Sequence, residues 1–216
     1  MKIIDFSGDI HRKKHFDFFR SMDQPHFNIC APIEIDPLLD FIKKEQIPFT
    51  AMMVYIVSRV ANSIDAFRQR IRGEQVVEHS KVHPSFTVKT EASSVFSFCY
   101  VDYTSDLRQF AQQAQEAIAA MQIQPSFEDE ANRDDFLYIS ALPWIRFTSL
   151  QHAMHYDPVD SVPRIAWGKY YKEGGLTKIP LSVQAHHALV DGIHMGEYFT
   201  RFQENCLNPR IFWAGT

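Results

Sequence analysis

Apolar and polar residues alternate over positions 179–187, with the period of two that is typical of a β-strand with one buried face. The apolar positions are Ile179, Leu181, Val183 and Ala185. Continuing the alternation places His187 on the apolar face and His186 on the polar one. We expect the following Asp191-Gly192 pair to end the strand in a tight turn, because glycine tolerates the backbone angles that such a turn requires.

Helical and strand periods are mixed along the rest of the chain. The spacing of Met195, Phe199, Phe202 and Cys206 predicts a helix directly after the turn. The longest helical stripe runs from position 49 to about position 70, and shorter helices are predicted over 11–20, 38–44 and, after a cap at Ser105-Asp106, 107–121. Strands are predicted over 27–35, 76–79, 86–89, 95–100, 137–147 and 164–170, with a loop over 122–135. The fold class predicted is α/β, an α+β two-layer sandwich with helices packed on one face of a mixed β-sheet.

The composition predicts a single domain over residues 1–216. The chain is 45% hydrophobic and 13% aromatic, which is enough to fill one core, and it contains no repeat or low-complexity linker. A net charge of −4 gives no electrostatic reason to expect nucleic acid or an anionic membrane as a partner. The three cysteines are widely spaced, and neither a signal peptide nor a membrane-spanning run is recognisable, so we expect a cytoplasmic protein.

His187 is the first candidate for chemistry. A histidine on a buried face is partly removed from water, which favours the neutral ring that a general base needs. Packing or surface polarity is the ordinary alternative for such a histidine. A metal site is another alternative, since His187, Asp191 and His194 would share one face of a continuous helix. The strand period and the Asp-Gly break argue against that helix, and we predict no metal.

Four segments together resemble the chloramphenicol acetyltransferases, a family that shares its fold with the acyltransferase cores of 2-oxo acid dehydrogenase complexes. The His-His-x-x-x-Asp-Gly motif at 186–192 resembles the active-site signature of this family. Residues 12–19 (RKKHFDFF), 139–144 (ISALPW) and 168–170 (GKY) match in the same order and at similar separations. The resemblance spans essentially the whole chain, and a coenzyme A-dependent acyltransferase is the activity that it implies.

Acyl transfer to an alcohol needs a base for the acceptor hydroxyl and a donor for the developing oxyanion. We expect His187 to act directly on the substrate hydroxyl, because no serine or cysteine lies in a recognisable nucleophile elbow. The resemblance implies that Ser140 is the oxyanion donor and that Asp191 pairs with Arg12 to support the site. From residue types alone, Ser140 could equally be an ordinary strand serine, and Asp191 could have a purely structural role.

The resemblance implies acetyl-CoA as the acyl donor. Tyr170 offers a flat surface for adenine and Lys169 a cation for phosphate, while Trp144 could line the pantetheine channel. Taken singly, these residues also fit a surface lysine, an edge-strand aromatic residue and a core tryptophan. The chain has no phosphate-binding or dinucleotide glycine motif, so nucleotide hydrolysis and hydride transfer have no support.

The resemblance implies a homotrimer that binds the acceptor at its subunit interfaces. In the resembling family, chloramphenicol lies there among aromatic and aliphatic side chains. Phe18 and Phe19 match aromatic positions of that pocket. Other positions depart from it: the segment 21–26 around Asp23 is more polar, His152 and Arg164 replace apolar residues, and Ala166 replaces a residue with a hydroxyl group.

These departures leave the acceptor open. It could be chloramphenicol, which would make the protein an antibiotic-resistance enzyme, or another hydroxyl or thiol compound, since charged groups in an apolar pocket need partners or water. Two further alternatives are an acyltransferase core of a dehydrogenase complex, which normally carries lipoyl and linker segments first, and a small-molecule binding module without turnover.

Overall fold

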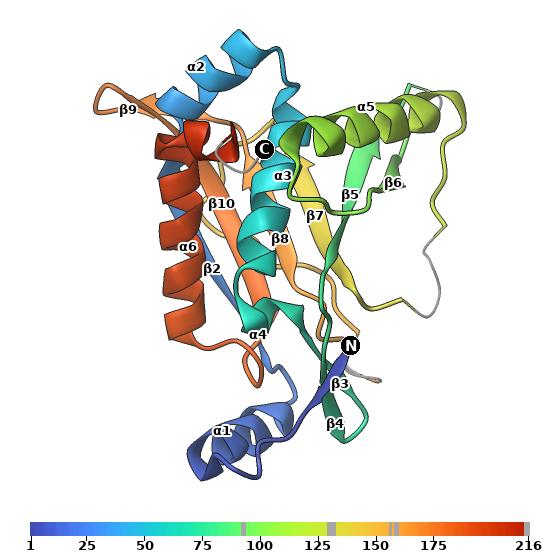
Figure 1. The fold of residues 1–216 in the computed structure, drawn as a ribbon, viewed down its shortest axis with the longest axis vertical. Coiled ribbons are helices and arrows are strands. Elements are labelled where there is room, and N and C mark those ends of the chain that lie inside the picture. Colours follow the sequence, from blue (N-terminus) through green and yellow to red (C-terminus); the bar gives the residue numbers. More distant parts are fainter. Residues whose placement is uncertain (92–93, 129–132, 156, 158–159, 214–216) are drawn as a thin grey trace.

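The computed structural model describes residues 1–91, 94–128, 133–155, 157 and 160–213. Its centre is a seven-stranded sheet with the order β2-β10-β8-β7-β5-β6, to which β9 adds by pairing with β10 (Figure 1). β7 runs parallel to β5 and to β8, whereas the other described pairs of this sheet are antiparallel. The strands are β2 (His26–Glu34), β5 (His83–Lys89), β6 (Phe96–Tyr100), β7 (Phe136–Leu142), β8 (Arg164–Gly168), β9 (Tyr171–Glu173) and β10 (Leu176–His186).

Helices cover one face of this sheet, which confirms the predicted two-layer arrangement (Figure 1). They are α2 (Asp36–Glu45), α3 (Phe49–Asn62), α5 (Leu107–Ile123) and α6 (Gly192–Leu207). The central helix, α3, is apolar around most of its circumference and is almost entirely buried, as expected for a helix with neighbours on all sides. None of the helices in the described part of the chain has the length and hydropathy needed to cross a membrane.

A smaller sheet, with the order β1-β4-β3, lies with α1 (Ile10–Arg20) at one end of the molecule (Figure 1). Its strands are β1 (Lys2–Ile4), β3 (Gln69–Arg72) and β4 (Gln75–Glu78). The predicted helix over 49–70 is wrong beyond Asn62, because a short helix, α4 (Asp65–Arg68), and then β3 follow it.

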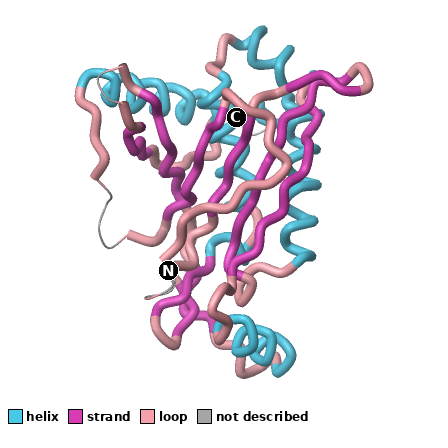
Figure 2. The backbone as a smooth tube through the Cα atoms, turned by 180° about the vertical axis from the view of Figure 1, so that it is seen from behind, coloured by secondary structure: helices cyan, strands magenta, loops and turns pink. Residues whose placement is uncertain are grey.

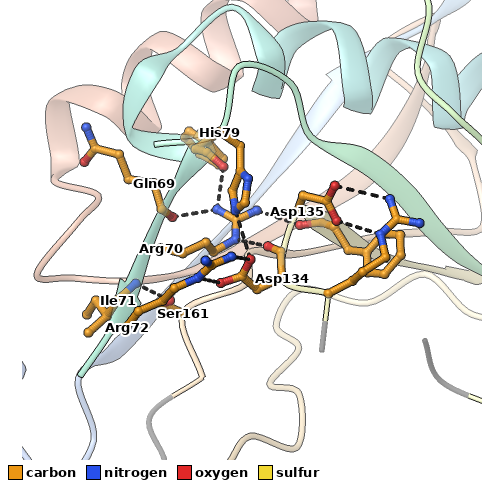
Figure 3. Close-up of polar contacts among 11 residues, drawn as sticks. Gln69, Arg70, Ile71, Arg72, His79, Asp134, Asp135 and Ser161 are labelled. Carbon is orange, nitrogen blue, oxygen red and sulfur yellow. Dashed lines mark hydrogen bonds and ion pairs between the residues drawn. The ribbon is translucent and has the colours of Figure 1, made fainter. Parts of the chain in front are cut away.

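Arg70 explains why the chain is extended at β3. Its guanidinium group is fully buried and donates hydrogen bonds to four carbonyl oxygens at 2.6–2.9 Å, two of them at the start of β7 (Figure 3). Burial lowers the pKa of Arg70 to about 10. Beside it, Arg72 and His79 both contact the carboxylate of Asp134. These contacts tie the β3–β4 hairpin to the main sheet, and a continuous helix would not present Arg70 to them.

The second face of β10 is also buried, so the expectation that this strand has one buried face is wrong. Ser182, Gln184 and His186 point to this face and are at most 2% exposed. An irregular segment between β7 and β8 crosses it (Figure 2). This segment contacts the sheet through the backbone N–H of His152, which donates to Gln184, and through the carbonyl of Asp160, which contacts the His26 ring. Loop backbone therefore supplies a partner for Gln184 on β10 and for His26 on the neighbouring strand β2.

Candidate active site

His187 is the first residue after β10, and its ring is held by aromatic contacts. It stacks on Phe19 with a centroid distance of 3.7 Å and on Phe27 with a distance of 4.3 Å. Two rings at such distances and shallow angles cover opposite faces of the imidazole. Phe27 pairs with Ala185 across the strands, so His187 lies on the apolar side as predicted. The imidazole Nδ1 is buried without a hydrogen-bond partner in the described chain.

The turn after His187 leads into α6 through Asp191. The backbone N–H of His187 donates to the carbonyl of Pro25 at 2.8 Å. The Asp191 carboxylate caps α6, and its own N–H donates to Nδ1 of His194 at 3.0 Å, which completes a capping box. Gly192 is not among the residues with left-handed backbone angles; it is the first residue of α6. The expectation that Gly192 makes the turn is therefore wrong, because the chain turns before it.

Arg12 lies beside this turn but does not form the expected ion pair with Asp191. Its Nη2 donates to the carbonyl of Leu189 at 2.7 Å, and its Nη1 donates to Nδ1 of His15 at 2.9 Å. Within the described chain, no ion pair within 4.0 Å joins Arg12 to Asp191, whose carboxylate accepts hydrogen bonds at the N-terminus of α6. Burial lowers the pKa of Arg12 and the nearby charge of Asp191 opposes this shift, so the two groups still attract each other.

His15 completes this cluster, although no pattern in the sequence predicted a role for it. Its ring lies 4.8 Å from the Phe19 ring and 5.5 Å from the His187 ring. Burial, followed by the charge of Arg12, lowers the pKa of His15, which favours the neutral ring. Arg12, His15 and Phe19 recur at the i, i+3, i+7 spacing of one helix face, and this spacing is the signal that could have identified His15.

The proposed metal set of His187, Asp191 and His194 is not assembled, because the segment is not a continuous helix and His194 is used in the capping box. Potential ligand atoms of His15, His187 and Asp191 do lie within 4.8 Å of one another. However, Nδ1 of His15 accepts a hydrogen bond from Arg12, so in the neutral ring Nε2 carries the proton and offers no lone pair. With a guanidinium group adjacent, this donor set fits a hydrogen-bond network better than a cation.

Ser140 lies on β7, where two cavities meet. One has a volume of about 490 Å³ and extends past Trp144, and the other has a volume of about 350 Å³ and extends toward Arg164. Both are lined by Thr87, Phe96, Ser140 and His152. Ser140 pairs with Ala166 across the strands, so the small side chain of Ala166 is its neighbour on the sheet.

Ser140 and His187 are not brought together within one chain. Ser140 pairs with Ala166, and Ala166 pairs with Ser182, so Ser140 is two strand spacings away from β10. His187 lies five residues further along from Ser182, which places the two candidates on the order of 20 Å apart.

Lys169, Tyr170 and Trp144 gather at one end of β7 and β8. The end residues of these strands, Leu142 and Gly168, pair with each other, and the backbone N–H of Lys169 donates to the carbonyl of Ile145 at 2.8 Å. All three candidate side chains are exposed, Trp144 by 70%, so it is not a core tryptophan.

Of the remaining candidates, Phe18 and His152 are accessible to a ligand. Phe18 is 59% exposed and meets Phe19 edge to face at 5.1 Å, close to His187. His152 lines both cavities, and burial lowers its pKa to about 4. Arg164 is buried but satisfied, because it forms an ion pair with Asp160 and donates to the carbonyl of Val162 at 3.1 Å.

Comparison with known proteins identifies relatives over almost the full length. Residues 1–203 match the family model described as chloramphenicol acetyltransferase. A chloramphenicol acetyltransferase from Klebsiella sp is 30% identical, over 91% of this chain and 90% of its own length. Chloramphenicol acetyltransferase 3 from Escherichia coli is also 30% identical, over 90% and 92%.

Solved structures agree with these relatives. A chloramphenicol acetyltransferase structure superposes with a TM-score of 0.82 at 25% identity, over 94% of this chain and 98% of that one. A dihydrolipoamide acetyltransferase from Azotobacter vinelandii shares the fold, with a TM-score of 0.68 at 15% identity, over 99% of this chain and 98% of that one.

Proposed function

Because the chain belongs to the chloramphenicol acetyltransferase family and is an acyltransferase, we propose that it transfers an acetyl group from acetyl-CoA to a hydroxyl group of a small acceptor. The names of the relatives make chloramphenicol the first acceptor to test. The observation that carries this proposal is the His187 ring, which lies at the C-terminal end of β10, is stacked on two aromatic rings and has one buried nitrogen.

His187 acts as the general base through Nε2. Its Nδ1 is buried and cannot reach a ligand, so Nε2 is the ring nitrogen available to the acceptor. In the neutral ring, Nε2 has a lone pair only when Nδ1 carries the proton. Nε2 then takes the proton of the acceptor hydroxyl as its oxygen attacks the thioester carbonyl, and the imidazolium later returns this proton to the departing thiolate of coenzyme A.

Ser140 stabilises the tetrahedral intermediate by donating its hydroxyl hydrogen to the oxyanion. Since one chain holds Ser140 and His187 on the order of 20 Å apart, the complete site needs the serine of a neighbouring copy. A closed ring of identical subunits places the same two surfaces together at every interface. We infer a homotrimer with one active site at each interface.

Acetyl-CoA enters along the larger cavity, whose described lining includes Trp144, Thr50 and Lys89 as well as Ser140. Lys169 and Tyr170 lie at the same end of the sheet, where a cation and an exposed ring can hold the phosphate and adenine groups. The acceptor binds in the smaller cavity, which is also lined by Ser140. Two cavities meeting at one hydroxyl group suit a reaction between two substrates.

Thiol release from acetyl-CoA tests this function. We expect the wild-type protein to release coenzyme A in the presence of chloramphenicol or another hydroxyl acceptor. His187→Ala should lower kcat by about 10²–10⁴-fold, the usual contribution of a general base. The exposed His11 provides a control, and His11→Ala should keep full activity.

Circular dichroism should show the same fold for both variants. Near-normal turnover by His187→Ala would contradict the mechanism. A wild-type protein that binds an acceptor without releasing thiol would instead be a binding module.

A further inference from the structure

The turn that carries His187 takes most of its hydrogen bonds from one residue, His186, at the end of β10. The backbone N–H groups of Leu189 and Val190 both donate to the carbonyl of His186 at 3.0 Å. The N–H of Ala188 donates to the Nδ1 atom of the His186 side chain at 3.2 Å. Ala188 is fully buried, so the imidazole provides the partner that this N–H needs.

The imidazole of His186 is in the state that can accept this bond. It is buried, and burial lowers its pKa to about 3, so the ring is neutral near pH 7. In a neutral ring whose Nδ1 accepts, the proton is on Nε2. The ring meets that of His26 edge to face at 4.9 Å, and the Nε2 of His26 donates to the carbonyl of Asp160 at 2.6 Å. His186 thus lies between the turn and a histidine that is itself held by the segment covering the sheet.

The conformation of this turn determines where the His187 ring lies. The ring is stacked between Phe19 and Phe27 at the first residue of the turn. Two residues further on, the carbonyl of Leu189 accepts a hydrogen bond from Arg12, which belongs to the same helix as Phe19. A change in the turn would therefore shift the imidazole relative to its stacking partner. Displacing a reacting group by about 1 Å can lower the rate about 10²-fold.

We infer that His186 is a positioning residue for the proposed acetyl transfer. Its Nδ1 holds the N–H of Ala188 and thereby fixes the turn in the conformation that keeps the His187 ring stacked, with Nε2 directed at the acceptor. His186 does not touch the substrates and acts through His187. This inference rests on the proposed function, which assigns the role of base to His187.

Two amide substitutions test the Nδ1 atom. The Oδ1 of asparagine takes the place of Nδ1, whereas the amide of glutamine lies near the place of Nε2 and leaves Ala188 without an acceptor. We expect His186→Asn to keep kcat within about threefold of wild type, and His186→Gln to lower kcat by about 10–100-fold with KM for acetyl-CoA changed by less than about twofold. Equal kcat values for the two variants, or a loss expressed in KM alone, would overturn the inference.

His83 at the start of β5 provides the matched control. Its Nδ1 accepts a hydrogen bond from the backbone N–H of Tyr103 at 3.1 Å, and His83 is not among the described lining residues of the two cavities. His83→Gln removes the same kind of contact, so we expect a lower unfolding temperature with unchanged kcat. An equal loss of kcat in His83→Gln would show that lost stability explains the effect at His186, which would also overturn the inference.

Nuclear magnetic resonance of the protein with isotope-labelled histidine tests the same geometry without any reaction. In the wild-type protein, we expect the nitrogen shifts of His186 to place its proton on Nε2 near neutral pH. The Cε1–H signal of His187, identified by its loss in His187→Ala, should be shifted by the ring currents of its two aromatic neighbours. This shift should persist in His186→Asn and diminish in His186→Gln.

These signals separate the two levels of inference. If the wild-type protein releases no thiol but the signals behave as expected, the acetyl transfer fails and the positioning of the His187 ring by His186 stands. If thiol release occurs but the His186 proton is on Nδ1, or the His187 signal is the same in both amide variants, the acetyl transfer stands and the positioning role fails.

Discussion

Asp191 combines two separable effects at one position. Its carboxylate oxygen caps α6, and its negative charge attracts the partly buried Arg12. Asparagine caps a helix about as well as aspartate, so substitution by asparagine removes the charge and keeps the cap. This difference allows the two effects to be measured apart.

We expect Asp191→Asn to lower the free energy of unfolding by about 1 kcal/mol more than Asp106→Asn, because it leaves the buried Arg12 without its counter-charge. Asp106 is the matched control, since it caps α5 in the same way through two backbone N–H groups. Urea unfolding of both variants measures the difference. Equal losses would mean that Asp191 acts only as a helix cap, and reduced activity at unchanged stability would indicate a direct role in catalysis.

At the residue scale, the sequence predicts which way a single side chain points better than it predicts which two side chains meet. The face of His187 follows from a period of two, which is a local property of the strand. The Arg12–Asp191 pair does not form as expected because both groups have nearer partners. The guanidinium group donates to the carbonyl of Leu189, and the carboxylate accepts from backbone N–H groups at the N-terminus of α6. The helical spacing of Arg12, His15 and Phe19 places His15 on the same helix face, but its contact with His187, a residue far away in the chain, is not visible in that local pattern.

At the scale of elements, Gly168 controls how the segment between β7 and β8 lies on the sheet. A Cβ atom at this position would meet the carbonyl oxygen of Ile145 and Cγ of Pro180 at 2.7 Å, and Cε1 of Phe147 at 2.9 Å. Two of these contacts belong to the segment that covers the second face. Even the smallest side chain would push this segment away from β8.

Gly168→Ala should therefore lower the free energy of unfolding by about 1–3 kcal/mol, the usual range for overpacking. Gly196 on α6 is exposed, and a Cβ atom added there would meet no other atom within 4 Å. Gly196→Ala should consequently raise the free energy of unfolding by up to about 1 kcal/mol through helix propensity. Thermal unfolding of the pair provides the measurement. A neutral Gly168→Ala would show that the covering segment can shift without loss.

The elements that the sequence predicts are those long enough to show a period. The helix after Asp191, the helix capped by Asp106 and the strands of the main sheet other than β9 are confirmed, although the strand predicted over 137–147 ends at Leu142. β1 and β9 have three residues each and carry no readable alternation. β3 begins at the end of the predicted 49–70 helix, and its extended backbone depends on pairing with β4 and on the buried carbonyl partners of Arg70. The second buried face of β10 depends on a distant loop.

At the scale of the whole molecule, the separation of Ser140 and His187 is the dominant feature. It follows from strand order and register, which are set by pairings between distant segments and are not visible in any single motif. The sequence motifs therefore identify Ser140 and His187 as candidates, but they do not show that the two residues lie far apart in one chain. If the active site is shared between subunits, then two inactive variants with different defects can repair each other.

We expect His187→Ala and Ser140→Ala to be inactive alone and to regain activity when they are unfolded and refolded together. Some interfaces in the mixed trimers join an intact His187 to an intact Ser140, and random mixing makes these roughly a quarter of all sites. Thiol release before and after mixing measures the recovery, with each variant refolded alone as the control. No recovery, despite mixed oligomers detected by native mass spectrometry, would place both residues in one subunit.

The burial of β10 on both faces also affects how the reaction centre can move. This strand has paired neighbours on both sides, so exposing its backbone requires disruption of the main sheet. By contrast, α1, which supplies His15 and Phe19, has Phe16 as its one buried residue. The backbone of His187 is thus fixed to the end of an interior strand, whereas Phe19, which stacks on its ring, belongs to a helix that can fluctuate locally.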